Sequence, residues 1–293
     1  MRAHRIAVFG SSGQIGSALM RRARSRTEVT GFTHAEVDIT DAKAVRESLA
    51  RTGATIAINA AAYTAVDRAE SEPDRAYAIN RDGAANLAEA CRALDIALIH
   101  LSTDYVFDGT KAGSYIESDP IAPLGVYARS KAEGEAAVLR LSPKGFVLRT
   151  SWVYGLEGTN FVKTMLQLGT ERDIARVVND QRGSPTFADD LAHALLVLAG
   201  DMDSASSRIY HLAGQGIATW HELAREVFVE TARRGLRTPR LEENTTLQYP
   251  TPARRPANSV LDSGLFKRDL GIELPPWRDG LKRMLAAHLE TVR

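Results

Sequence analysis

The sequence predicts a doubly wound parallel α/β sheet, with a smaller α/β substrate lobe built from the C-terminal half of the chain. Two observations lead to this fold class. Short apolar segments alternate with longer segments whose apolar residues recur at helical spacing, which is typical of parallel strands joined by right-handed crossovers. In addition, a glycine-rich turn from Gly10 to Gly16 follows the first apolar segment and opens the first helical one.

Five strands and four helices are expected in the first 150 residues. The strands are the runs Arg5 to Phe9, Glu28 to Phe32, Thr55 to Asn59, Ile96 to Leu101 and Lys144 to Arg149. The helices are Gln14 to Ser25, Asp41 to Arg51, Pro73 to Leu94 and Ser130 to Leu141. Residues 1–150 are therefore expected to form a dinucleotide-binding domain, with ligands beyond the carboxyl ends of the strands.

The alternation loosens after residue 150. Helical spacing recurs over Phe161 to Thr170, Ala188 to Ala199 and Thr219 to Arg234, and the last of these opens on the capping-box pattern Thr219-Trp-His-Glu222. We expect residues 151–293 to form mainly a substrate-binding lobe, with some later segments returning to the first domain.

Composition narrows the function classes. The 293 residues are 44% apolar and 25% charged, and Lys+Arg at 37 nearly balance Asp+Glu at 36. With positive and negative charges nearly equal, no overall electrostatic field attracts the chain to nucleic acid or to an anionic membrane. An anionic ligand must therefore be bound by local groups. The single cysteine, Cys91, excludes an internal disulfide, and no apolar run approaches the roughly 20 residues of a membrane span. A cytoplasmic protein is expected.

The glycine turn predicts a cofactor site. Its sequence, Gly10-Ser-Ser-Gly13-Gln-Ile-Gly16, allows a tight turn and lets backbone N–H groups approach a pyrophosphate at the positive end of a helix. Together with the alternating elements, this turn favours a Rossmann-type sheet that binds a dinucleotide.

The choice of dinucleotide follows from the end of the second strand. An acid that holds the ribose hydroxyls of NAD is usual about 20 residues past the first glycine, and this chain has Thr33 and His34 there. Without a carboxylate to repel a 2′-phosphate, we expect NADPH, with NADH also used. Asp38 and Ile39 are expected under the adenine.

Tyr127 and Lys131 form a candidate catalytic pair, because residues four apart lie on one face of a helix. A nearby ammonium is expected to lower the pKa of the phenol, which could then deliver a proton to a ketone as hydride arrives. Thr103 and Asp104 follow the fourth strand, at the same sheet edge as the glycine turn. The Thr103 hydroxyl could bind the reacting oxygen.

These motifs resemble those of the extended short-chain dehydrogenase/reductases, and within them the reductases of dTDP-linked 4-keto sugars. The matching blocks occur in the right order along nearly the whole chain. They are Gly13 to Gly16, Asn59 to Asp67, Ala69 to Glu72, Ser102 to Phe107, Arg149 to Tyr154, Asn179 to Thr186 and Tyr249 to Ser259.

The resemblance implies NAD(P)H-dependent reduction of the C4 ketone of dTDP-4-dehydro-β-L-rhamnose. It makes Tyr127 the proton donor, Lys131 its partner and a ribose ligand, and Thr103 the stabiliser of the reacting oxygen. The implied contacts to the dTDP-sugar are Asp104 and Trp152. Because its two phosphates need local cations in a chain of near-zero net charge, we also expect Arg255, which lies in a matching block, to bind them, with Asn258 as a neighbouring polar contact. The implied cofactor lining is Gly13, Gln14, Ile15, Asp38, Ile39, Ala62, Tyr63, Thr64 and Leu101, beside Gly10 and Gly16 of the turn.

Several alternatives stay open at this stage. Trp152 could serve core packing, and Arg255 could lie on a solvated loop. The same Tyr-Lys pair also serves nucleotide-sugar epimerases, and a noncatalytic regulatory subunit shares this scaffold. Some members of the family bridge a homodimer through Mg²⁺ held by glutamates. Ala18 stands where the first-helix glutamate is expected, which argues against Mg²⁺ here and leaves the homodimer open.

Overall fold

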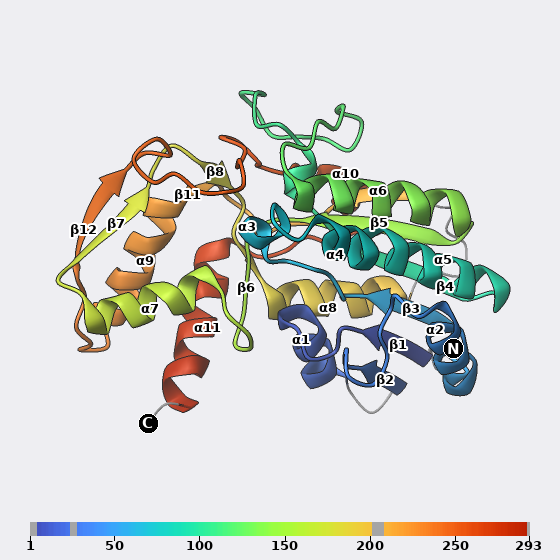
Figure 1. Cartoon of the computed structure of the whole chain (residues 1–293). Helices are drawn as coiled ribbons and strands as arrows, with labels where there is room; N and C mark the ends of the chain where they lie inside the picture. Colours follow the sequence, from blue (N-terminus) through green and yellow to red (C-terminus); the bar gives the residue numbers. More distant parts are fainter. Residues whose placement is uncertain (1–4, 24–27, 201–207, 292–293) are drawn as a thin grey trace.

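The computed structural model describes residues 5–23, 28–200 and 208–291, and its core is a six-stranded parallel sheet (Figure 1). The strand order is β10-β5-β4-β3-β1-β2. These strands are β1 (Arg5–Phe9), β2 (Glu28–Phe32), β3 (Ile56–Asn59), β4 (Ala97–Thr103), β5 (Gly145–Thr150) and β10 (Arg208–His211). The order reverses between β1 and β3, and ligands of such sheets bind beyond the strand ends at this switch point. The predicted fold class is confirmed.

Helices cover both faces of the sheet (Figure 1). Along β1, Ile6 and Val8 face α1 (Gln14–Arg22) and α8 (Ala188–Ala199), whereas Ala7 and Phe9 face the other side. That second face is covered by α2 (Ala42–Thr52), α5 (Gly83–Ala93) and α6 (Val126–Leu141). The alternation of side chains along a strand explains the two layers. Ala18 is fully buried in the first of them.

The predicted helix from Pro73 to Leu94 is interrupted. It consists of α4 (Pro73–Tyr77), a π-helical turn (Ala78–Asp82) and α5. The turn directs Asn80 inward, where its side chain accepts from the backbone N–H of Tyr63 and donates to the Tyr63 carbonyl and to Ser130 Oγ. Such turns are frequent at functional sites, and this one joins α6 to the loop after β3.

Helix α6 begins at Val126, four residues before the predicted start. Its first turn is held from outside the helix, because Glu70 Oε1 accepts a hydrogen bond of 2.8 Å from the Val126 N–H. Glu70 follows the short helix α3 (Val66–Ala69). Tyr127 therefore lies in the first turn of α6, at the carboxyl edge of the sheet.

The second lobe packs α7 (Phe161–Glu171), α9 (Trp220–Ala232) and α11 (Trp277–Thr291) around a separate apolar core. A parallel pair of strands, β7 (Ile174–Val178) and β12 (Arg240–Asn244), lies at its outer edge (Figure 1). Two short pairs lie nearer the large sheet: β6 (Val153–Tyr154) with β9 (Thr186–Phe187), and β8 (Arg182–Gly183) with β11 (Ala218–Thr219). A last short helix, α10 (Gly264–Leu270), packs on β10.

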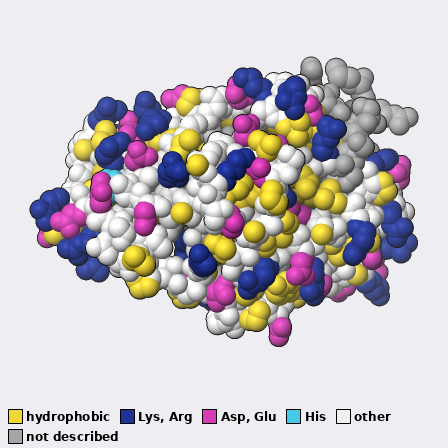
Figure 2. Space-filling view, turned by 90° about the horizontal axis from the view of Figure 1, so that it is seen from above, with side chains coloured by type: hydrophobic (Ala, Val, Ile, Leu, Met, Phe, Trp, Pro, Cys, Tyr) yellow, Lys and Arg dark blue, Asp and Glu magenta, His cyan; other side chains and the backbone are white. Residues whose placement is uncertain are grey.

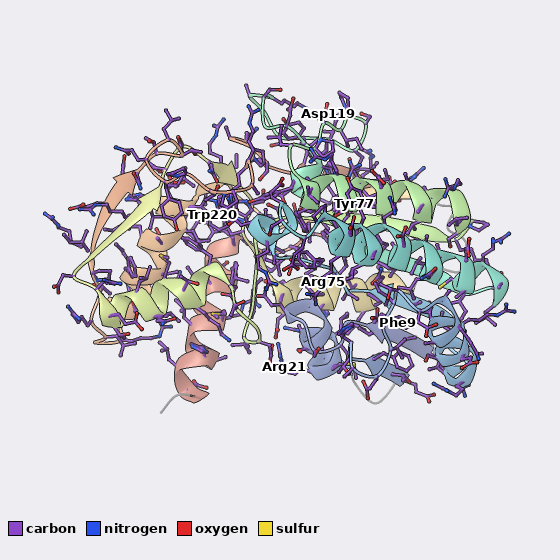
Figure 3. All side chains as sticks on the ribbon, viewed as in Figure 1. Phe9, Arg21, Arg75, Tyr77, Asp119 and Trp220 are labelled. Carbon is purple, nitrogen blue, oxygen red and sulfur yellow. The ribbon has the colours of Figure 1, made fainter. Side chains whose placement is uncertain are left out.

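The surface agrees with the near-zero net charge. Figure 2 shows Lys and Arg side chains interspersed with Asp and Glu across the face it presents. Arg21 of α1 lies at the junction of the two lobes (Figure 3), and it pairs there with Glu157 and with Asp189. No helix in the described ranges is long and apolar enough to cross a membrane.

Gly134→Ala tests the contact between α6 and the π-helical turn. An added Cβ would lie 2.1 Å from the carbonyl oxygen of Asn80, so the helices must separate. We expect the free energy of unfolding in urea to fall by about 1–3 kcal/mol. In the control Gly113→Ala the new methyl group meets no atom within 4 Å, and a change below about 0.5 kcal/mol is expected. Equal stability of the two variants would contradict the account.

Candidate active site

A cavity of about 670 Å³ opens at the carboxyl ends of β1, β3, β4 and β5, beside the second lobe. Many of the residues singled out from the sequence line it together: Gly13, Gln14, Ile15, Ala62, Thr64, Leu101, Thr103, Asp104, Tyr127, Lys131 and Trp152. Others lie outside its lining: Gly10, Gly16, Asp38, Ile39, Tyr63, Arg255 and Asn258. One cavity thus joins the glycine turn to the Tyr-Lys pair.

The glycine turn has the geometry that a pyrophosphate requires. Gly10 has φ +79°, and a Cβ there would lie 2.6 Å from the backbone nitrogen of Ala61. A Cβ on Gly16 would lie 2.1 Å from the Gly10 carbonyl, so strand, turn and helix touch without side chains. Gly13 is the N-cap of α1 and supplies no capping side chain. The first N–H groups of α1 therefore face the cavity, ready for an anion.

A carboxylate bonds to Thr33, just after the end of β2. Glu36 folds back onto Thr33, and its Oε2 accepts hydrogen bonds of 2.8 Å from both the Thr33 N–H and the Thr33 hydroxyl. These bonds lower the pKa of the Glu36 carboxyl. The Phe32 carbonyl, just before, accepts from the N–H groups of Gly10 and Ser11. Thr33 and His34 thus stand where the acid is usual, and a carboxylate from three residues further along the chain bonds to Thr33.

Asp38 and Ile39 stabilise the turn before α2. Asp38 Oδ1 accepts from the backbone and the hydroxyl of Thr40, both at 2.9 Å. Ile39 is buried against Gly83, and its carbonyl accepts from Asn86.

Lys131 is deeply buried, with 2% of its surface exposed. Its Nζ donates a hydrogen bond of 2.6 Å to the Leu101 carbonyl and lies 3.4 Å from His100 Nε2. Burial lowers the pKa of Lys131 to about 8, although the nearby Glu135 opposes the shift. Lys131 thus exists in both protonation states near neutral pH.

The pKa of Tyr127 moves opposite to the sequence expectation. Burial raises it to about 12, and a hydrogen bond with Thr103 only partly opposes the shift. In the interior, the desolvation of the phenolate and the nearby Asp104 carboxyl together outweigh the hydrogen bond with Thr103. Tyr127 is therefore a protonated phenol at neutral pH, in the form that can donate a proton.

Asp104 lies beside this pair as a buried carboxyl. Its Oδ1 accepts from the Thr103 hydroxyl at 3.1 Å and its Oδ2 from Ser151 Oγ at 3.0 Å. Burial raises the pKa of Asp104 to about 6 in spite of these bonds. Ser102 and Thr150 also line the cavity, and their buried hydroxyls have, among the described residues, no hydrogen-bond partner. Unpaired buried hydroxyls at a cavity wall fit a polyhydroxy ligand.

The aromatic wall of the cavity includes one residue that the sequence reading missed. Trp152 has φ +47°, a backbone conformation that side chains rarely adopt. Its ring stacks on Trp220 with centroids 3.5 Å apart and planes 3° apart, and both rings line the cavity. Trp220, the first residue of α9, lies on the side of the second lobe that is nearer the first domain (Figure 3). The sequence identified only the capping box around it.

Three predicted residues have structural partners of their own. Arg255 donates to Asp67 Oδ2 at 2.8 Å and to Asp67 Oδ1 at 3.1 Å. The Asn258 amide donates to the carbonyls of Lys111 and Gly113. The Tyr63 hydroxyl donates to Glu72.

Comparison with known proteins identifies the family. The family described as RmlD substrate binding domain matches residues 4–290. The chain belongs to this family. A relative in Sinorhizobium fredii, named dTDP-4-dehydrorhamnose reductase, is 45% identical over 289 residues, which are 97% of this chain and 98% of the relative. A relative of the same name in Escherichia coli K12 is 41% identical over 96% of both chains.

A solved RmlD-family structure has the same architecture. It is the dTDP-4-dehydrorhamnose reductase of Bacillus anthracis in complex with NADP, with a TM-score of 0.92, 34% identity and coverage of 98% of this chain and 100% of that one. The match includes both lobes. Within residues 5–23, 28–200 and 208–291 no group of three or more His, Cys, Asp or Glu side chains could hold a metal ion.

Gly183→Ala tests the aromatic wall. An added Cβ would lie 2.3 Å from the Trp152 ring, so the ring must leave its stack on Trp220. Parallel indoles at this distance couple, and we expect the near-ultraviolet circular dichroism of wild type to weaken in the variant. Gly113→Ala is the matched control. An unchanged spectrum in Gly183→Ala, with the protein folded, would show that the stack does not depend on this glycine.

Proposed function

We propose that this chain reduces the C4 ketone of dTDP-4-dehydro-β-L-rhamnose with NADPH or NADH. The observation that carries the proposal is that the bare glycine turn and the group of Tyr127, Lys131 and Thr103 open onto one cavity. The reductases that share most of its length support the choice of sugar nucleotide.

The geometry supports a division of labour among the side chains. A bound reduced nicotinamide supplies the hydride to the carbonyl carbon. Tyr127, held as a phenol by burial, donates its proton to the carbonyl oxygen as charge develops there. The Thr103 hydroxyl, which donates to Asp104 in the structure, turns to the same oxygen and stabilises that charge. Lys131 holds the nicotinamide ribose.

The sugar nucleotide is proposed to lie between the domain of residues 1–150 and the lobe of residues 151–293. Asp104 and the unpaired hydroxyls of Ser102 and Thr150 would bind sugar hydroxyls, and Trp152 would pack on the apolar face of the sugar. Arg255 would meet the diphosphate, sharing its guanidinium with Asp67. Asn258 would contribute next to Arg255 by fixing the loop of residues 111–113, to which its amide donates two hydrogen bonds.

The cofactor site is proposed to bind both NADPH and NADH. Gly10, Gly13 and Gly16 would cradle the pyrophosphate, and Gln14, Ile15, Ala62, Thr64 and Leu101 would line its path. The lining would be supported by three residues that lie outside it: Tyr63, Asp38 and Ile39. A solved relative binds NADP, which supports NADPH. The Glu36 carboxylate beside Thr33 supports NADH, because it would accept from a free 2′-hydroxyl and repel a 2′-phosphate.

Turnover tests the reaction itself. The protein, NADPH and dTDP-4-dehydro-β-L-rhamnose should consume reduced cofactor and release dTDP-β-L-rhamnose. Tyr127→Phe should lower kcat by about 10² to 10⁴-fold with little change in cofactor affinity, because only the proton donor is lost. Absence of turnover by folded protein with bound cofactor would exclude the reductase. Tightly retained oxidised cofactor would then indicate an epimerase, and inertness toward every sugar nucleotide a noncatalytic subunit.

Glu36→Gln tests the cofactor preference. If the Glu36 carboxylate lies beside the adenosine ribose, its removal should improve NADPH binding relative to NADH by about fivefold, because it no longer repels the 2′-phosphate. The measurement is the dissociation constant of each dinucleotide by calorimetry. Glu47→Gln, on the exposed side of α2, is the matched control. Equal ratios in the two variants would remove Glu36 from the cofactor site.

A further inference from the structure

A buried chain of polar side chains runs from β3 to Lys131 behind the cavity. Asn59 Nδ2 lies 3.0 Å from His100 Nδ1, and His100 Nε2 lies 3.4 Å from Lys131 Nζ. At most 2% of the surface of each of these three side chains is exposed. Of the three, only Lys131 was singled out from the sequence.

The protonation of His100 follows from its neighbours. The Asn59 amide oxygen is occupied, because it accepts a 3.1 Å hydrogen bond from the backbone N–H of Ala61. The amide nitrogen is thus the atom that faces His100 Nδ1, and an amide nitrogen can only donate. Nδ1 must therefore be unprotonated. Burial, and the nearby Lys131, hold the pKa of His100 well below its usual range, so the ring is neutral and its proton is on Nε2.

This tautomer has a consequence for Lys131. An ammonium carries three donors and no acceptor, so it cannot accept the N–H of His100 Nε2. A neutral amine can donate to the Leu101 carbonyl at 2.6 Å and accept from His100 with its lone pair. The arrangement matches a neutral amine and opposes an ammonium.

We propose that His100, oriented by Asn59, is a positioning residue that directs its Nε2–H at Lys131 and favours the neutral-amine form of this side chain on the Leu101 carbonyl. Protonation of Lys131 makes the contact with His100 repulsive, and the ammonium is then released toward the cavity, where Tyr127 lies. His100 thereby sets the pH at which Lys131 becomes the ammonium that serves the reaction. This role in catalysis rests on the proposed reductase function.

The other charged groups near Lys131 do not substitute for His100. Glu135, one turn along α6, favours the ammonium, but its carboxylate is engaged by Arg149 at 2.7 Å. Tyr127 is a neutral phenol, and Asp104 lies beyond Thr103. Among these groups, only the Leu101 carbonyl and His100 Nε2 lie within hydrogen-bonding distance of Lys131 Nζ.

The tautomer can be read directly in the wild-type protein. Long-range ¹H–¹⁵N correlation spectra of histidine distinguish a proton on Nε2 from one on Nδ1. We expect His100 to be neutral and protonated at Nε2. A proton on Nδ1, or a charged ring, would overturn the proposal, and this measurement requires no variant and no substrate.

Two variants then test the effect on Lys131. His100→Asn keeps an oxygen that accepts from Asn59 but ends short of Lys131, whereas His100→Gln is long enough to direct an N–H at it. With ¹³C-labelled lysine, assigned by loss of one signal in Lys131→Met, the pKa of Lys131 should rise by about one unit in His100→Asn, a tenfold gain in proton affinity. It should stay near the wild-type value in His100→Gln. An unchanged pKa in folded His100→Asn would overturn the role of His100.

Neither measurement uses turnover, so their failure is distinct from failure of the reductase assay. If the proposed reaction is also correct, the pH profile of kcat should shift in His100→Asn in the same direction as the Lys131 pKa. A loss of rate at all pH values without that shift would indicate damage to the fold and contradict the positioning role.

Discussion

The hydrogen bond from Lys131 Nζ to the Leu101 carbonyl is the contact on which the site depends. It ties the buried face of α6 to the end of β4, and so places Tyr127, one turn earlier on the same face, beside Thr103. The start of α6 is fixed from two further directions, by Glu70 at Val126 and by Asn80 at Ser130. The proposed catalytic group is thus positioned by helix, strand and π-helical turn together.

Burial dominates the electrostatics of the cavity. It raises the pKa of Tyr127 to about 12 and of Asp104 to about 6, and it lowers that of Lys131 to about 8. All three shifts favour neutral forms at the cavity wall. In the proposed complex, anionic ligands would therefore meet backbone N–H groups of the glycine turn and hydroxyls, and Arg255 only at the margin. This agrees with a chain whose opposite charges nearly cancel.

The sequence predicted the parts of the site that depend on local spacing. The glycine turn and the Tyr127–Lys131 pair follow from short-range geometry, and the strand order brings them to one edge. It could not predict groups that arrive from elsewhere or through irregular backbone. Glu36 folds back onto Thr33 through a local turn, and Trp220 stacks on a ring far from it in the sequence, that of Trp152. Asn80 is directed inward by a π-helical turn, which helical periodicity does not reveal. The sign of the Tyr127 shift required knowledge of burial, which spacing alone does not contain.

The central claim is that this cavity brings a sugar ketone to a reduced nicotinamide beside Tyr127. Its most direct test is isotope transfer from NADPH in which both hydrogens at C4 of the nicotinamide are replaced by deuterium. Mass spectrometry of the sugar product should find one deuterium at its C4 for each cofactor oxidised. A reduced sugar without deuterium would contradict the account, because the hydrogen would then have come from another source.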